Sequence, residues 1–270
     1  MSSKAATMPT YFLSHGGGPW PWLEGPYREA CRLLEDSLRR LPQDLPEPPR
    51  AILMVSGHWE EREFAVMGNP QPKMLYDYAG FPEHTYHVQY PAPGAPALAV
   101  RIQTLLRSAG LKAHLDADRG FDHGVFAPLA VAFPAADVPV TQLSLRADLD
   151  PEVHLAAGRA LASLRDEGIL IIGSGLSYHN LRLFDPRAAA PSRAFDDWLQ
   201  TTLLHTAAPA RSVRLRAWDS APSARTAHPR ADHLLPLMVA VGAAETDTAA
   251  LAYHEDAFLG GIAVSSFRFG

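Results

Sequence analysis

Short, continuous apolar runs constrain the fold of this chain more than any other feature of the sequence. Four of them cover residues 11–13, 51–55, 138–145 and 169–172, and residues 262–269 add an alternating pattern. Continuous apolar runs predict strands that are buried on both faces, which requires helices on each side of the sheet. We therefore expect an α/β fold, a three-layer sandwich with a central, mostly parallel or mixed sheet flanked by helices.

Segments with helical spacing lie between these runs. The clearest is a stripe of apolar residues at every third or fourth position, made of Tyr27, Cys31, Leu34, Leu38 and Leu41. Residues 95–106, 153–164 and 195–204 show similar patterns, and the apolar stretch 234–244 predicts a core helix. Since no internal repeat interrupts this alternation, we expect residues 1–270 to form a single domain.

Charge and composition exclude several classes of partner. The net charge is -5 with histidines neutral, and no basic run occurs, which argues against nucleic acid and against an anionic membrane surface. The longest apolar stretch is too short to span a bilayer, and the first residues lack the apolar region of a signal peptide. A single cysteine allows no intrachain disulfide, which fits a reducing compartment. We expect a cytoplasmic protein.

Several histidines share one setting. His15, His58 and His179 each come after an apolar run and a few small residues, near the expected carboxyl end of a strand. Open α/β sheets bind ligands at that edge. His123 lies in a turn-like segment before a helix, and His233 opens the helix predicted over 234–244. Imidazoles without thiolates suit a catalytic zinc site or a non-haem Fe(II) site.

A single histidine is more often an ordinary loop or core residue than a ligand. His114, His154 and His205 are expected on the solvated faces of regular elements. His84 and His87 lie in residues 77–96, a stretch rich in proline and aromatic residues that predicts a loop over a site. We expect that loop to shape a substrate pocket, with four residues as candidate substrate contacts: Tyr78, Phe81, His84 and His87.

One glycine-rich motif suggests a serine hydrolase as an alternative. The sequence His15-Gly16-Gly17-Gly18 matches the oxyanion-hole motif of some esterases. Such enzymes also need a Gly-x-Ser-x-Gly turn, and the nearest candidate, which starts at Gly175, has a histidine in place of the last glycine. This reading is therefore disfavoured, while a zinc-dependent hydrolase or a non-catalytic member on the same scaffold remain alternatives.

The chain resembles the class III extradiol ring-cleavage dioxygenases, in the branch of the 4,5-DOPA extradiol dioxygenases. Seven segments carry the resemblance, in order along most of the sequence. They are Phe12-Leu13-Ser14-His15-Gly16, Val55-Ser56-Gly57-His58-Trp59, Asp77-Tyr78-Ala79-Gly80-Phe81-Pro82, Tyr90-Pro91-Ala92-Pro93-Gly94, Gly120-Phe121-Asp122-His123-Gly124, Gly173-Ser174-Gly175 before His179-Asn180-Leu181, and Ala227-His228-Pro229 before Asp232-His233. His233 stands where better-known members of the class have a carboxylate ligand.

This resemblance implies an enzyme that uses non-haem Fe(II) and O2 to open a catechol ring next to its hydroxyls, with Zn(II) as an ion that purified protein can carry. It implies that His15, His58 and His233 are the primary metal ligands. It also implies that His179 is an acid/base residue near the metal or a further ligand, and that His123 faces the substrate or oxygen. The sequence does not name the catechol, and it leaves a homo-oligomer open.

Overall fold

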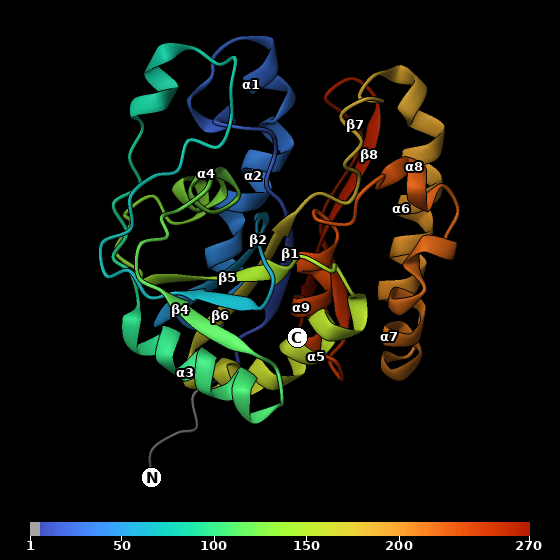
Figure 1. The fold of residues 1–270 in the computed structure, drawn as a ribbon. Helices are drawn as coiled ribbons and strands as arrows, with labels where there is room; N and C mark the ends of the chain where they lie inside the picture. Colours follow the sequence, from blue (N-terminus) through green and yellow to red (C-terminus); the bar gives the residue numbers. More distant parts are fainter. Residues whose placement is uncertain (1–5) are drawn as a thin grey trace.

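The computed structural model describes residues 6–270, and one eight-stranded sheet runs through them (Figure 1). In chain order the strands are β1 (Thr10–Ser14), β2 (Ala51–Glu61), β3 (Phe64–Met67), β4 (Ala113–Asp116), β5 (Val140–Arg146), β6 (Ile169–Gly175), β7 (Ala249–Phe258) and β8 (Ile262–Phe269). Their order across the sheet is β4-β3-β5-β2-β6-β1-β8-β7. The central strands β5, β2, β6 and β1 are parallel, and β8 pairs antiparallel with β1, so the predicted mixed sheet is confirmed.

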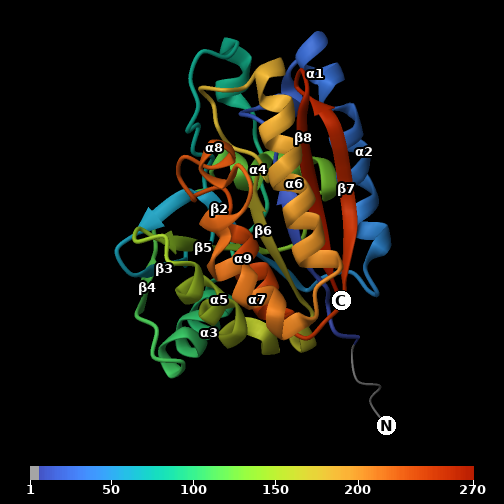
Figure 2. The same ribbon diagram turned by 90° about the vertical axis from the view of Figure 1, so that its right-hand side faces the viewer.

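Helices cover both faces of this sheet, which confirms the three-layer prediction. One face packs against α3 (Pro96–Ser108), α5 (Pro151–Leu161), α6 (Ala189–Leu204) and α9 (Leu235–Ala243), with α7 (Ala208–Arg216) and the short α8 (Ala224–Ala227) outside them. The other face packs against α2 (Arg32–Arg40) and α4 (His123–Ala132), next to α1 (Pro26–Ala30). Figure 2 shows α2 and α6 on opposite sides of β7 and β8. No helix in the described part of the chain is both long and apolar enough to cross a membrane.

Helix α9 is the core helix that the apolar stretch predicts, and every one of its residues is buried. It packs on β1, β2 and β6. The approach is close because β6 carries glycines: a Cβ on Gly175 would lie 2.0 Å from the main-chain oxygen of His233. Leu176 N instead donates a hydrogen bond to that oxygen, at 3.1 Å. His233, two residues before α9, is thus fixed to the end of β6.

Three strands, helices α7 and α8, and one helix break were not predicted from the sequence. Strand β3 has only four residues and follows a run of charged side chains, while β4 and β7 are edge strands with partly exposed residues. The helical stripe over 27–41 is two helices, because Cys31 between α1 and α2 leaves the helical conformation (φ -94°, ψ 5°). His154 is not on a solvated face as expected: it is fully buried, with Phe64 of β3 against its ring.

Candidate metal centre

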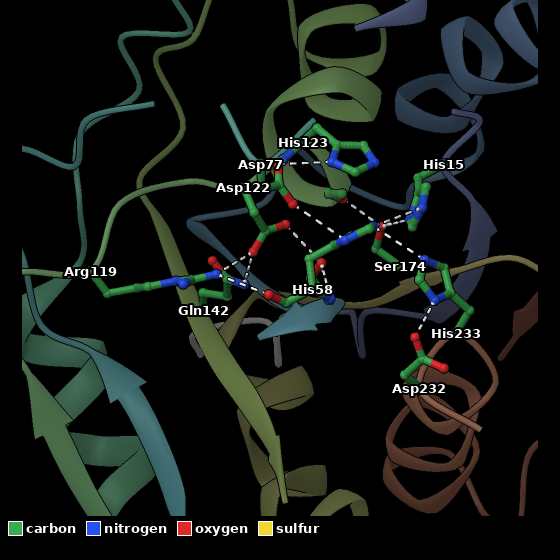
Figure 3. A network of polar contacts seen from close by, with 12 residues as sticks. His15, His58, Asp77, Arg119, Asp122, His123, Gln142, Ser174, Asp232 and His233 are labelled. Atoms are coloured by element: carbon green, nitrogen blue, oxygen red, sulfur yellow. Dashed lines mark hydrogen bonds and ion pairs between the residues drawn. The ribbon is translucent and has the colours of Figure 1, made fainter. Parts of the chain in front are cut away.

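Three histidines from distant parts of the sequence meet at the carboxyl ends of the central strands (Figure 3). His15 directly follows β1, His58 lies in β2 where its pairing with β5 changes register, and His233 precedes α9. Strand β6 runs between β1 and β2. Its last residues pair with Ser14 of β1 and Ser56 of β2, next to the two histidines. The Nε2 atom of His58 lies 3.3 Å from that of His15 and 3.2 Å from that of His233.

The other ring nitrogen of each histidine faces an oxygen atom. His15 Nδ1 lies 3.0 Å from Ser174 Oγ, whose own proton goes to a main-chain carbonyl, so Nδ1 must donate. His233 Nδ1 lies 2.9 Å from Asp232 Oδ2, and His58 Nδ1 lies 3.3 Å from Asp77 Oδ2. The hydrogen bonds place the proton of the neutral His15 and His233 rings on Nδ1, and the carboxylate beside His58 Nδ1 favours the same form of that ring. The lone pairs of all three Nε2 atoms therefore point at one another.

A divalent cation fits this arrangement. Burial, followed by the proximity of the other histidines, lowers the pKa of His15 and His233 well below the usual range. Burial and the nearby His123 lower the pKa of His58 to about 4, against the opposing effect of Asp122 and Asp77. All three rings are thus neutral near pH 7, the form that binds metals. Metal–imidazole bonds of about 2.1 Å put ligand nitrogens roughly 3.0–3.4 Å apart, as found here.

Two acidic residues, one buried and one half-buried, hold the cluster in place, as Figure 3 shows. Asp122 accepts hydrogen bonds from Ser56 Oγ at 2.7 Å and Gln142 Nε2 at 2.6 Å, and it pairs with Arg119 at 2.8 Å. Since Ser56 Oγ also accepts from the main-chain N–H of His58, at 3.2 Å, this network fixes the backbone that carries the ligand. Asp232 acts directly on a ring, through its contact with His233. Such partners orient ligand histidines and raise their basicity.

His179 joins the cluster in a different way. Its ring lies flat on that of His233, with centroids 3.4 Å apart and planes within 11° of parallel. Because imidazole lone pairs lie in the ring plane, two parallel rings at this spacing cannot direct them at one point. The main-chain N–H of His179 bonds to Ala227 O at 2.9 Å, so the residue is anchored by its backbone while its half-buried ring faces a cavity.

His123 also faces the cavity, and it is held by a residue that the sequence analysis did not single out. Asp77 Oδ1 accepts from the His123 ring at Nδ1 (2.8 Å) and from its main-chain N–H (3.0 Å). Burial alone would raise the pKa of Asp77, but the hydrogen bond from the His123 side chain helps lower it to about 2. One ionised carboxylate therefore contacts both His123 and His58. The sequence signals were its place at the start of the loop predicted over the site and at the start of the matching segment 77–82.

The cavity beside the histidines measures about 1000 Å³. All five histidines of the cluster line it, together with Gly16, Gly17 and Gly18. Tyr78 and Phe81 from the predicted substrate loop also line it, whereas His84 and His87 do not. Those two face outward: His84 Nε2 lies 3.0 Å from Trp22 O, and His87 pairs with Glu83 on the surface.

Comparison with known proteins agrees with this geometry. The model of the catalytic LigB subunit of aromatic ring-opening dioxygenase matches residues 9–266. The chain belongs to this family. The family resemblance inferred from the seven segments is thereby confirmed, and this LigB-family member is an extradiol ring-cleaving dioxygenase.

Several relatives of this LigB-family chain match it over most of their length. The 4,5-DOPA dioxygenase extradiol of Beta vulgaris is 38% identical, over 100% of this chain and 99% of the relative. The Dioxygenase tasH of Hapsidospora irregularis is 36% identical, over 96% of this chain and 85% of the relative. The crystal structure of an uncharacterized protein from Escherichia coli K12 superimposes with a TM-score of 0.79 and 31% identity, over 97% of this chain and 100% of that one.

Proposed function

We propose that this dioxygenase opens the ring of a catechol with O2, using Fe(II) held by His15, His58 and His233, and that residues 1–270 form one catalytic domain. The observation that carries the proposal is the convergence of three Nε2 atoms, each from a ring with an oxygen beside its Nδ1, at the edge of a cavity large enough for an aromatic ring. We also propose a cytoplasmic location, in line with a single cysteine that is buried.

Fe(II) bound to these histidines supplies the chelation of the catechol oxygens and the transfer of electron density to O2. The protein contributes the rest. The histidines are the polar part of the cavity wall, so a catechol binds there with its hydroxyls toward them. Tyr78 and Phe81 from the loop then form one aromatic wall beside the ring, since the two side chains contact each other edge to face, with centroids 5.5 Å apart.

His179 is the proposed proton carrier, and His123 is the proposed second catalytic residue. His179 is the general base that takes a catechol proton and returns it to the leaving oxygen, because its ring faces the cavity but cannot share a metal with His233 in the stacked geometry. The Nδ1–H of His123 donates a hydrogen bond to Asp77. This leaves Nε2 toward the cavity as the second polar contact for the reacting groups. Imidazole suits this work since its ordinary pKa lies near neutral pH.

Anaerobic loading with Fe(II), followed by addition of O2 and a panel of catechols, tests the proposal. We expect one O2 consumed per catechol and a yellow ring-opened semialdehyde. Protein loaded with Zn(II), which the same histidines would also hold, is the matched control and should consume no O2. Fe(II)-loaded protein that takes up no O2 with any catechol would refute the proposal, and a colourless muconate product would contradict cleavage outside the hydroxyl pair.

A further inference from the structure

The cavity is much larger than one catechol ring requires. Its volume of about 1000 Å³ is at the upper end of the range for sites that enclose drug-sized ligands. Beyond the histidines, its walls come from α1, from the segment after His179 and from the turn between β7 and β8. Figure 1 shows α1 and that turn at the same end of the molecule. The side chains there are aromatic or aliphatic: Tyr27, Ala30, Leu181, Phe184, Phe258 and Leu259.

No described residue that lines this cavity is a lysine, an arginine or a glutamate. The one carboxylate, Asp77, has an oxygen engaged by each of His123 and His58. The two tyrosine hydroxyls are also turned toward the protein: Tyr78 donates to Thr85 O at 2.6 Å, and Tyr27 contacts Gly17 O at 3.4 Å. Away from the histidines, the cavity therefore offers a ligand no free charge.

The nearest basic side chain on α1 is also unavailable. Arg28 lies between Tyr27 and Ala30 in sequence but bonds to Trp20 O and pairs with Glu35 at 2.6 Å, outside the cavity. The rim itself is apolar, since Leu181 is 72% exposed and still lines the cavity. An exposed leucine that continues an apolar wall is suited to a ligand that covers it.

We propose that the physiological substrate is a catechol whose ring carries a bulky, uncharged, apolar substituent. The inference rests on the proposed ring-opening function and deepens it. With its hydroxyls at the histidines, such a molecule places its substituent along the walls formed by Phe184, Phe258 and Leu259. An amino-acid tail, as in DOPA, would bring a carboxylate and an ammonium group into a space with no partner for either, which is costly.

Catechols of matched shape test this inference. We expect kcat/KM to rise about fourfold for each methylene from 4-methylcatechol to 4-propylcatechol, the gain typical of a buried CH2 group. Against 4-propylcatechol, we expect a loss of about 100-fold or more for 3-(3,4-dihydroxyphenyl)propionate, dopamine and DOPA. If DOPA is opened as efficiently as 4-propylcatechol, the inference is wrong while the ring-opening function stands. If no catechol in the series is opened, the function itself fails.

Binding gives a readout that does not depend on turnover. 4-Alkylphenols lack the second hydroxyl, so they should bind in the cavity without being cleaved. Calorimetry on the purified protein under argon should show affinity that increases with chain length, together with a negative heat-capacity change from apolar burial. Affinity that is independent of chain length would contradict an apolar substituent site, even if the enzyme opens simple catechols.

A new charge at the rim sharpens the test. Leu181→Arg places a cation at an exposed position, where the fold should tolerate it, and should raise kcat/KM for the propionate relative to 4-propylcatechol by about tenfold. Val213→Arg is the matched control, because Val213 is 54% exposed on α7 and does not line the cavity. We expect the control to leave the ratio unchanged. An equal response from both variants, or none from Leu181→Arg, would count against this wall as the substituent site.

Discussion

His154 and His15 are both almost completely buried, yet their ring nitrogens are in opposite situations. His154 Nδ1 donates to Asp150 O at 2.7 Å, and its Nε2 accepts from the main-chain N–H of Arg146 at 3.1 Å. Both of its nitrogens are thus satisfied by the backbone. In His15 only Nδ1 has an oxygen partner, and Nε2 faces the equivalent atom of His58.

This difference separates a structural histidine from a candidate ligand. Burial lowers the pKa of both residues, so neither burial nor protonation state distinguishes them. What distinguishes them is Nε2 of His15, which faces the ring nitrogen of another histidine instead of a main-chain group, a setting that suits a cation. Since a buried polar atom without a partner is costly, such a cluster is maintained only where something binds to it.

The largest expected effect is the loss of a ligand from the cluster. His233→Ala should reduce the bound metal to a small fraction of the wild-type amount, because even loss of a residue behind a ligand typically costs about 10–100-fold in affinity. Metal analysis of the purified variant after Fe(II) loading measures this. His154→Gln is the control and should keep its metal. Equal metal content in both variants would contradict the comparison between the two kinds of histidine.

The next largest effect belongs to His179. His179→Ala should retain its iron and still bind catechol, but turn over about 10²–10⁴-fold more slowly, as is typical when a general acid/base is removed. Single-turnover kinetics and metal analysis on the same sample separate the two properties. If this variant loses iron as readily as His233→Ala, then His179 is a fourth ligand, its stacked geometry changes on metal binding, and the proton-carrier role passes to His123.

Asp77→Asn should have a smaller effect. The neutral amide can still approach His123 but no longer holds its Nδ1 proton as a charged acceptor, so kcat per bound iron should fall about 10–100-fold. Because Asp77 also contacts His58, iron content is measured on the same sample. Glu83→Gln is the control from the same loop: it removes a surface carboxylate that contacts only His87. We also expect the pH profile of kcat to move in Asp77→Asn and to stay in place in the control. An unchanged profile would indicate that Asp77 acts through folding alone.

The sequence predicted the parts of this site that depend on strand ends. His15 and His58 were found because a buried strand, small residues and a histidine follow one another, and such ends meet at one edge of a parallel sheet. His58 was placed after its strand, whereas the strand continues past it to Glu61 with a register shift. Asp77 was not assigned a role because its partner His123 is 46 residues away, and nothing local in the sequence links them.

His154 shows why burial is harder to predict. Its position on α5 suggests a solvated face, but Phe64 of the short strand β3 covers it. A strand of four residues beside a charged run gives no usable periodicity. The sequence therefore could not predict that β3 covers His154. Edge strand β7 was missed for a related reason: a strand with one exposed side needs no continuous apolar run, and Glu255 and Asp256 interrupt the pattern.

The smallest expected effect concerns stability at acid pH. It tests whether His154 is a structural histidine. Burial lowers the pKa of His154 to about 4 in the folded protein, below the ordinary value of 6.5. As pH falls below 6.5, the unfolded chain takes up a proton at this residue and the folded protein does not. The folded state is therefore destabilised progressively between pH 6.5 and 4, by about 2 kcal/mol at pH 5.

His154→Gln should remove this dependence, because a glutamine offers one donor and one acceptor and does not titrate. The quantity to compare is the change in unfolding free energy between pH 7 and pH 5, measured by denaturant titration in the wild type and the variant, so that any constant cost of the substitution cancels. His205→Gln, at an exposed position, should behave as the wild type does. If His154→Gln loses as much stability on acidification as the wild type, His154 takes up its proton in the folded state as readily as in the unfolded chain, and the acid sensitivity of the protein comes from the metal-binding cluster instead.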